Sequence, residues 1–147
     1  MKKFELTSEF ITNIFGTKLF RIKALIEFGN VKAGELGGFV EKEENLNHEG
    51  NAWVYGNASV YGNAWVCGDA SVYGNADYAT VHGFGSEYRT TTFFKTKAGE
   101  IGVRCGCFYG NLSEFRKKVV ETHGETKKAK EYLMLADLME FRFSDNS

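Results

Sequence analysis

The chain has 147 residues, of which 43% are hydrophobic, enough apolar material for one compact unit or for a short repeat array with a small companion. Its formal net charge of -1 argues against a general affinity for nucleic acid or for anionic membranes. No stretch approaches the roughly 20 apolar residues of a membrane span, and the first residues lack the apolar core of a signal peptide. We therefore expect a cytoplasmic protein with no membrane partner.

Two runs near the N-terminus alternate between apolar and polar residues: Lys2–Leu6 and Lys18–Leu25. Alternation with period two is typical of half-buried strands, so these runs predict a hairpin. We assign residues 1–33 to an N-terminal β cap. The acidic stretch that follows predicts an irregular coil with solvated glutamates, in which Val40 and Leu46 fall in line with the alanine column described next.

Residues 50–77 repeat a six-letter phrase with little variation. Each unit begins with Gly and then Asn or Asp, an alanine follows, and a valine comes two positions later. Gly and Asn adopt positive φ at low cost, so each pair predicts a corner, and the residues between corners predict a short strand. The alanines are Ala52, Ala58, Ala64, Ala70 and Ala76, and the valines are Val54, Val60, Val66 and Val72. A fixed short period is typical of a chain that stacks on itself.

Side-chain alternation along each short strand predicts which residues face inward. Ala and Val of one unit share a face, which we take as the inner one, and the residue between them faces outward. The expected outward residues are Trp53, Ser59, Trp65, Ser71 and Asp77. The tyrosines that precede the corners are also expected outside: Tyr55, Tyr61 and Tyr73.

The phrase V-Y-G-N-A-S resembles the hexapeptide repeat of left-handed parallel β-helix proteins, whose coils are triangular with three hexads each. The resemblance covers residues 50–77 well and implies that positions about 18 apart stack. It implies this stacking for Trp53 with Ser71, Val54 with Val72, and Tyr55 with Tyr73. We therefore expect a mainly β fold: a short, left-handed parallel β-helix or solenoid over residues 34–85, with an N-terminal β-hairpin cap and a C-terminal ββαα unit.

The C-terminal part, residues 86–147, changes character. Thr90–Thr96 and Ile101–Phe108 predict two strands joined at K-A-G-E. Asn111, with a glutamate three positions later, predicts the capping box of a helix, and Glu125–Phe141 predicts a second helix with a broad apolar stripe. Between the repeat and these strands the pattern slips, so we expect either a bulge or an end plug. The residues that would form the plug are Tyr78 and Phe84.

The order of segments is also similar to that of a group of uncharacterised phage and prophage proteins. In those, an opening such as K-K-F-E-L-T leads to A-G-E-L-G-G-F-V-E-K-E-E-N-L and then to G-N-A-x-V-Y-G hexads. The resemblance covers most of the chain. It implies a phage origin, and hence the cytoplasm of a bacterial host, but no established activity.

Many hexapeptide-repeat proteins are acyltransferases in which a histidine acts as general base, so the resemblance raises an enzymatic alternative. That alternative predicts that His48 or His82 lies in a pocket beside a carboxylate. The third histidine, His123, is expected at a helix end. The chain also has three cysteines: Cys67, Cys105 and Cys107. Their number and spacing favour neither a disulfide framework nor a metal site, and we expect the C-x-C pair to be core residues on one strand face. We therefore expect no catalytic residue, no metal and no cofactor.

Clustered outward aromatic residues indicate a binding surface, because Trp and Tyr are favoured interface anchors. Burial against the same chain or an identical subunit is the other explanation. Aromatic faces beside cations also hold nucleobases and phosphates, and the strands after the repeat carry arginines. The candidate ligand- or partner-binding residues are Trp53, Tyr55, Tyr61, Trp65, Tyr73, Arg89 and Arg104.

These patterns favour a non-enzymatic binding protein, and the resemblance to phage and prophage proteins implies an accessory protein that antagonises host defence. It would bind a host effector protein or sequester a small signalling nucleotide, without general nucleic-acid binding. A short stacked array leaves its ends and aromatic faces uncovered, so we expect a homo-oligomer, a dimer or a trimer. The alternatives are an acyltransferase-like enzyme and a purely structural oligomerisation module.

Overall fold

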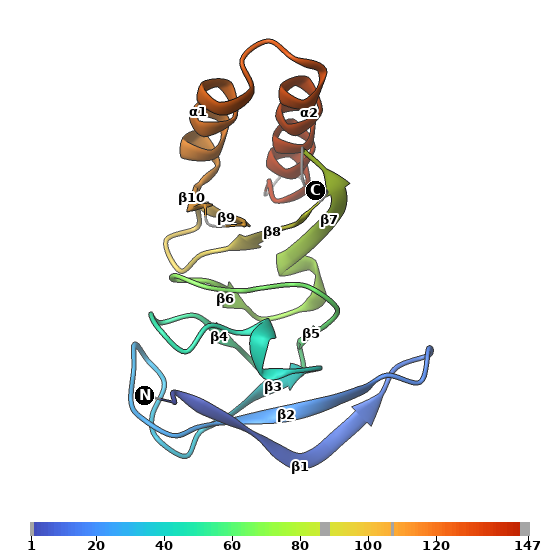
Figure 1. Cartoon of the computed structure of the whole chain (residues 1–147). Helices are drawn as coiled ribbons and strands as arrows, with labels where there is room; N and C mark the ends of the chain where they lie inside the picture. The colour runs from blue at the N-terminus through green and yellow to red at the C-terminus, as the bar shows by residue number, and fades with distance from the viewer. Residues whose placement is uncertain (1, 86–88, 107, 145–147) are drawn as a thin grey trace.

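The computed structural model describes residues 2–85, 89–106 and 108–144, and it shows an elongated molecule of stacked layers (Figure 1). A hairpin lies at one end, two helices lie at the other, and the repeat lies between them. The strands are β1 (Phe4–Thr12), β2 (Lys18–Ala24), β3 (Leu36–Val40), β4 (Trp53–Val54), β5 (Ser59–Val60), β6 (Ser71–Val72), β7 (Tyr78–Phe84), β8 (Arg89–Lys95), β9 (Ile101–Cys105) and β10 (Phe108–Asn111). The helices are α1 (Leu112–His123) and α2 (Lys127–Arg142), with short 3-10 turns η1 (Glu43–Asn45) and η2 (Asn75–Asp77).

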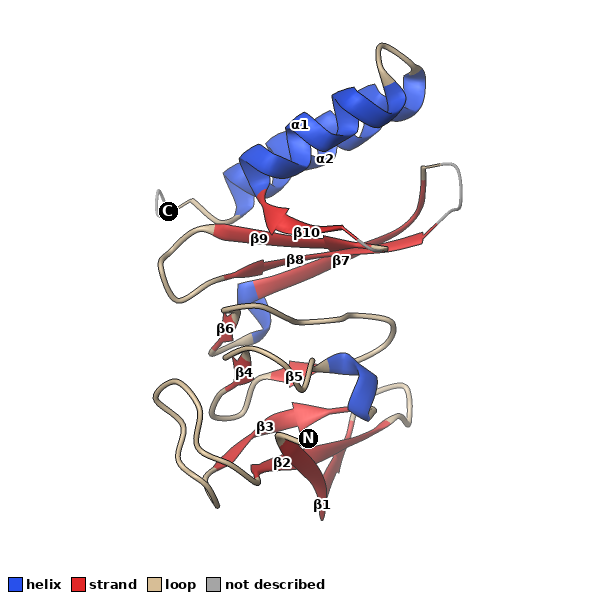
Figure 2. Cartoon of the chain, turned by 60° about the vertical axis from the view of Figure 1, so that its left-hand side comes forward, coloured by secondary structure: helices blue, strands red, loops and turns tan. Residues whose placement is uncertain are grey.

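The described strands form three sheets. One has the order β1-β2-β3-β5, a second pairs β4 with β6, and the third has the order β10-β9-β8-β7. Figure 2 shows α1 and α2 lying together on the face of the third sheet that points away from the repeat. The hairpin predicted near the N-terminus is confirmed, because β1 and β2 pair antiparallel with Phe4 opposite Ala24.

The predicted parallel β-helix, or solenoid, is wrong. The pairs β1–β2 and β2–β3 are antiparallel, and so are all three pairs of the sheet that contains β8. Parallel pairing among the described strands is limited to the short pairs β3–β5 and β4–β6, with one further bridge between Leu46 and Val66. The corners that recur every six residues leave strands of only two residues in the repeat, too short for the continuous parallel sheets of a β-helix.

The local stacking inferred for the repeat is nevertheless confirmed. Trp53 pairs with Ser71 and Val54 with Val72. The rings of Tyr55 and Tyr73 stack with centroids 4.3 Å apart and an interplanar angle of 11°. The stacking of positions 18 apart is therefore as the hexapeptide-repeat resemblance implied, whereas the arrangement of the surrounding sheets is not.

The register changes upstream of the repeat. Val40 pairs with Val60 and Leu46 with Val66, so these partners are 20 positions apart, whereas Trp53 and Ser71 are 18 apart. Two extra residues are thus inserted between Leu46 and Trp53, in the stretch L-N-H-E-G. The prediction that Val40 and Leu46 lie in the alanine column is wrong, because this insertion moves both into the valine column.

Trp53 was predicted to face outward, and this is wrong: its side chain is fully buried. Phe28 packs edge-on against its ring at 5.2 Å, and Phe4 does so at 6.3 Å. A Cβ on Gly37 would lie 2.7 Å from the Trp53 ring and 2.6 Å from the Val54 carbonyl oxygen. Glycine in the E-L-G-G-F-V stretch thus lets β3 approach the repeat closely enough to enclose the indole.

The C-terminal unit has more strands than predicted. The hairpin of β8 and β9 is confirmed, but β7 and β10 extend it to four strands, so the ββαα description is wrong. The slipped segment after the repeat is not a coil: its pairing with β8 shifts register between His82 and Phe84, as a bulge does, and of the two predicted plug residues Tyr78 alone packs against the core of the repeat. The segment is β7, an edge strand that begins at Tyr78 and ends at Phe84. The side chain of Tyr78 packs against the core of the repeat, whereas that of Phe84 packs beneath the helices.

Both helices begin at capping residues. Asn111 accepts a hydrogen bond from the backbone N–H of Glu114, whose carboxylate accepts one from the N–H of Asn111, as the capping box predicted. Thr126 caps α2 by accepting from the N–H of Ala129. Phe115 of α1 and Tyr132 of α2 then pack on the sheet beside Phe93.

Candidate functional site

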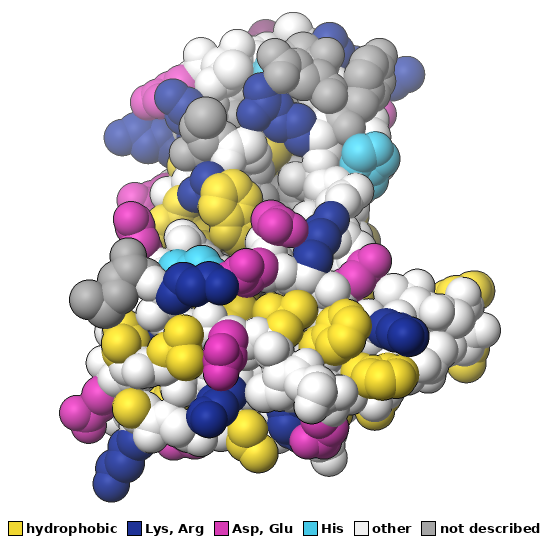
Figure 3. Space-filling model, turned by 60° about the horizontal axis from the view of Figure 1, so that its bottom comes forward, with side chains coloured by type: hydrophobic (Ala, Val, Ile, Leu, Met, Phe, Trp, Pro, Cys, Tyr) yellow, Lys and Arg dark blue, Asp and Glu magenta, His cyan; other side chains and the backbone are white. Residues whose placement is uncertain are grey.

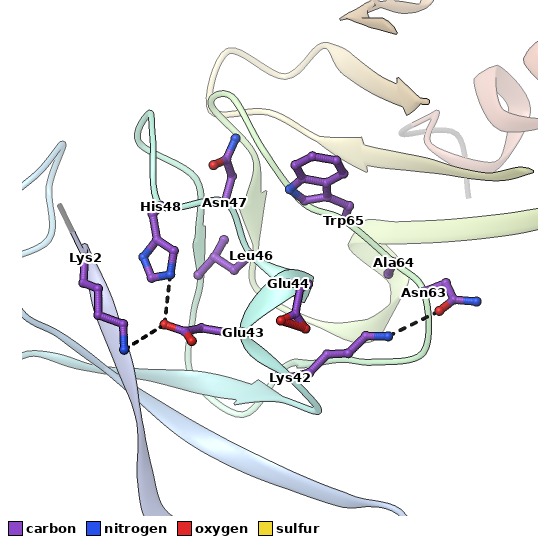
Figure 4. Close-up of a pocket in the computed structure, with 10 residues that line it drawn as sticks. All are labelled: Lys2, Lys42, Glu43, Glu44, Leu46, Asn47, His48, Asn63, Ala64 and Trp65. Carbon is purple, nitrogen blue, oxygen red and sulfur yellow. Dashed lines mark hydrogen bonds and ion pairs between the residues drawn. The ribbon is translucent and has the colours of Figure 1, made fainter. Parts of the chain in front are cut away.

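A cleft of about 580 Å³ opens beside the repeat, where η1 and the inserted stretch face the chain around Trp65 (Figure 4). We call it the Trp65 cleft. It is lined by Lys2, Lys42, Glu43, Glu44, Leu46, Asn47, His48, Asn63, Ala64 and Trp65. Its polar groups thus come from the N-terminus, from η1 and its flanks, and from one Gly-Asn corner of the repeat.

Trp65 forms a fixed aromatic wall of this cleft. Its backbone N–H donates to Thr92 Oγ1 at 3.1 Å, which ties it to β8. The guanidinium carbon of Arg104, on β9, lies 3.8 Å from the centroid of the Trp65 ring. Arg104 does not line the cleft, and the indole remains 38% exposed. The ring is therefore held in place from one face and keeps apolar surface available to a ligand.

Lys42 and Asn63 lie together at the side of the cleft below Trp65 (Figure 4). Lys42 Nζ donates to Asn63 Oδ1 at 3.3 Å. An ammonium has three donors and an amide has both donors and an acceptor, so this pair keeps hydrogen-bonding capacity for a ligand. An aromatic wall beside such groups can stack a planar ring and bind the polar edge or the anionic substituent of that ring.

His48 and Glu43 lie at the other end of the cleft. His48 Nε2 is 3.1 Å from Glu43 Oε1, and Lys2 Nζ is also 3.1 Å from that oxygen. The hydrogen bond from Lys2 lowers the pKa of the Glu43 carboxyl below its ordinary value; burial opposes this effect, and the charge of Lys2 adds to it. Glu43 is therefore a carboxylate at neutral pH.

The enzymatic alternative predicted a histidine in a pocket beside a carboxylate, and His48 meets that description. Its second nitrogen, however, is also engaged: Nδ1 accepts a hydrogen bond from the backbone N–H of Lys3 at 3.1 Å. That bond assigns the proton to Nε2, which donates it to Glu43, so neither nitrogen offers a lone pair to a substrate. The ring also stacks on Phe4 at 4.4 Å. This geometry suits a histidine that anchors the inserted stretch.

The other histidines lie away from the Trp65 cleft. His82 lies on the edge strand β7, and its Nδ1 is 2.8 Å from Oγ1 of Thr90 on the neighbouring strand β8. His123, at the end of α1, stacks against Tyr132 at 5.9 Å. The described residues contain no group of three or more His, Cys, Asp or Glu side chains placed to hold a metal ion.

The predicted binding residues do not form one surface. Trp65 and Arg104 come together, and so do Tyr55 and Tyr73, but Trp53 is in the core. The remaining two are distributed elsewhere: Tyr61 is exposed on a corner of the repeat, and Arg89 lines a hollow between the third sheet and the helices.

Two smaller hollows accompany the Trp65 cleft. One, of about 320 Å³, lies beside Tyr55 and includes Asp69 and Lys97. The other, of about 310 Å³, lies beneath the helices and includes Arg89 and Cys105. Cys107, which was predicted to share a strand face with Cys105, lies outside the described residues. Cys67 is buried, and burial raises the pKa of its thiol to about 11.

Sequence reasoning missed most of the cleft. Asn63 has the same position as the other corner residues of the repeat and was assigned only a turn. Glu43 and Lys42 belong to the acidic stretch that was expected to be solvated. The signal that could have found them is the broken register: L-N-H-E-G adds two residues to the repeat, and an insertion into a regular array often carries function.

No model of a known protein family matches this chain, and no curated protein matches its sequence. No helix among the described residues is both long enough and apolar enough to cross a membrane. Figure 3 shows the end of the molecule that carries the hairpin, with basic and acidic side chains interspersed over the visible face. A large basic patch of the kind that holds a nucleic-acid backbone is not seen on that face.

Proposed function

We propose that this chain is a non-enzymatic binding protein whose Trp65 cleft takes a nucleotide. The observation that carries the proposal is the Trp65 ring, which Arg104 holds at 3.8 Å from one face while the ring lines a cleft of about 580 Å³. A cleft of this size accommodates a small organic molecule rather than a chain. Stacking of a base on an aromatic side chain tolerates different bases and is worth about 1–3 kcal/mol.

The polar groups beside Trp65 suit the rest of a nucleotide. Asn47 and Asn63 supply amides that match the donor and acceptor edge of a base, and Lys42 supplies a cation for a phosphate. Glu43 and Lys2 form an ion pair at the far end, so the cleft as a whole is not strongly basic. This balance favours a ligand with few phosphates over a polyanion.

The resemblance to phage and prophage proteins supplies the biological side of the proposal. In the cytoplasm of a bacterial host, the chain would hold a signalling nucleotide and keep it from its receptor. Sequestration of this kind requires tight binding and no turnover, which agrees with a cleft whose histidine has both nitrogens engaged. A host effector protein is the alternative target.

Calorimetric titration with a panel of nucleosides, nucleoside monophosphates and cyclic nucleotides tests the proposal. We expect at least one nucleotide to bind, and Trp65→Ala to weaken it by about 5- to 150-fold, the equivalent of one lost stacking contact. Tyr73→Ala, which removes an exposed aromatic ring outside the cleft, is the matched control and should leave the affinity unchanged.

Lys42→Met separates recognition of the base from recognition of the phosphate. It should weaken the nucleotide by about 10- to 100-fold, because a charged hydrogen bond is lost, and leave the corresponding nucleoside unaffected. The bound nucleotide should be recovered chemically unchanged after long incubation. Binding that survives Trp65→Ala, or conversion of the nucleotide to a product, would count against this function.

A further inference from the structure

Helix α2 has two apolar faces. One is buried against the third sheet and α1, and it consists of Ala129, Tyr132, Ala136 and Met139. The other consists of Met134, Leu138 and Phe141, which are 69%, 54% and 77% exposed. These three residues recur at i, i+4 and i+7 and, at about 100° per residue, lie on the side of the helix opposite the buried set. We call them the α2 stripe.

We propose that the α2 stripe is the contact surface of a homodimer, in which α2 of one copy packs antiparallel on α2 of a second copy about a twofold axis near Met134. Contiguous apolar surface of this kind usually marks an interaction site. In a twofold interface, residue i of one copy contacts residue j of the other and residue j of the first contacts residue i of the second, so a single surface serves both copies. This inference concerns the helical end of the molecule and is independent of what the Trp65 cleft binds.

The charges around the stripe select the second copy as the partner and fix its direction. Lys127 and Lys130 continue the stripe toward the start of α2, and Asp137 flanks its later half. With the axis at Met134, antiparallel packing places Lys127 against Phe141 of the second copy and Lys130 beside Asp137 of the second copy. The first contact is a cation on an aromatic ring and the second is an ion pair, and symmetry repeats each of them.

Parallel packing would have the opposite electrostatic effect. Lys127 and Lys130 would each face the same lysine of the second copy, and Asp137 would face Asp137. Like charges in contact oppose association, so the charge pattern disfavours the parallel arrangement. Arg116 of α1 donates to Asp137 Oδ1 at 2.9 Å, which holds the carboxylate on the flank of the stripe. The helix dipoles also favour antiparallel neighbours.

Sedimentation velocity over a range of protein concentrations tests the dimer. We expect the apparent mass to rise with concentration from 16.5 kDa toward twice that value. Leu138→Glu, at an exposed position, should keep the helical content and hold the protein as a monomer at every concentration. The matched control is Ile14→Glu at the tip of the β1–β2 hairpin, where the side chain is 93% exposed. It places the same charge at the opposite end of the molecule and should leave the dimer intact.

Oxidative cross-linking tests the direction of packing. Met134→Cys should form a disulfide-linked dimer, because the axis brings the two copies of this position together. Lys127→Cys alone should not cross-link, but a mixture of Lys127→Cys and Phe141→Cys should. The wild-type chain, treated in parallel, reports any linkage through its own cysteines. A monomer at all concentrations, a dimer that survives Leu138→Glu or is lost in Ile14→Glu, or self-linkage of Lys127→Cys would overturn the proposal.

Discussion

The two tryptophans of the repeat lie in identical triplets but differ in burial, and substituting each one tests that difference. Both lie in the triplet A-W-V, yet Trp53 is fully buried and Trp65 is 38% exposed. Trp53→Ala removes a ring enclosed by Phe4 and Phe28 and leaves a cavity, so we expect it to cost about 3–5 kcal/mol of the free energy of unfolding. Trp65→Ala removes a half-covered ring and its contact with Arg104, so we expect a cost of about 1–2 kcal/mol.

Urea denaturation followed by far-ultraviolet circular dichroism measures both costs without relying on tryptophan fluorescence. The midpoint should fall much further for Trp53→Ala than for Trp65→Ala, with similar slopes. A complementary measurement uses iodide quenching of the single-tryptophan variants, in which only the emission of Trp65 should be quenched efficiently. Equal costs for the two substitutions, or efficient quenching of Trp53, would refute the assignment of these residues to core and cleft.

Three further predictions concern the fold. Lys3 is buried with its ammonium bonded to the carbonyl oxygens of Gly50 and Ala52, and burial lowers its pKa from 10.5 to about 8. Between those two pH values the unfolded chain binds more protons at Lys3 than the folded chain does, so raising the pH favours the folded state. The free energy of unfolding of the wild type relative to Lys3→Met should therefore rise by about 3 kcal/mol from pH 8 to pH 10.5, as measured by urea unfolding at each pH. A flat or falling difference would contradict this account of the lysine. Gly37→Ala should lower the free energy of unfolding by about 1–3 kcal/mol in the same assay, because its Cβ would lie 2.6 Å from a backbone oxygen. The control is Gly74→Ala, where a Cβ would have nothing within 4 Å and the free energy of unfolding should change by less than about 0.5 kcal/mol. Similar effects of the two substitutions would be inconsistent with close packing at β3. Asn111→Ala should lower the unfolding free energy by about 1 kcal/mol through loss of the α1 cap, and an unchanged urea midpoint would show that the cap contributes little.

Local features of the fold could be predicted from the sequence where local chemistry determines them. The pairing of Trp53 with Ser71 follows from the six-residue period together with the three-hexad coil that the hexapeptide-repeat resemblance implies, and the start of α1 follows from Asn111 and Glu114. The β1–β2 hairpin follows from alternation. Each depends on residues close in the sequence or on a repeat that copies itself.

The arrangement of the sheets could not be predicted in the same way. The repeat contributes strands of two residues, and the long strands that surround it come from segments outside the repeat. The environment of Trp53 is decided by Phe4 and Phe28, whereas that of Trp65 is decided by Arg104. Because identical triplets acquire different neighbours through tertiary packing, no periodicity could distinguish the buried ring from the exposed one.

The cleft was missed for a related reason. Asn63 occupies the corner position shared by every hexad, and only its place opposite Lys42 makes it part of a site. His48 was considered as a general base, but its role depends on the backbone N–H of Lys3, which is 45 positions away in the chain. Contacts of this kind follow from the completed fold and carry no local signature.

Native mass spectrometry of the protein purified from bacterial cells is the most direct test of nucleotide binding in the Trp65 cleft, because it detects a retained ligand without assuming its identity. We expect a bound species of nucleotide mass on the wild type and on Tyr73→Ala, and its loss on Trp65→Ala. A ligand-free wild-type protein that also fails to bind any nucleotide in titration would contradict the claim, as would a retained species that persists when Trp65 is replaced.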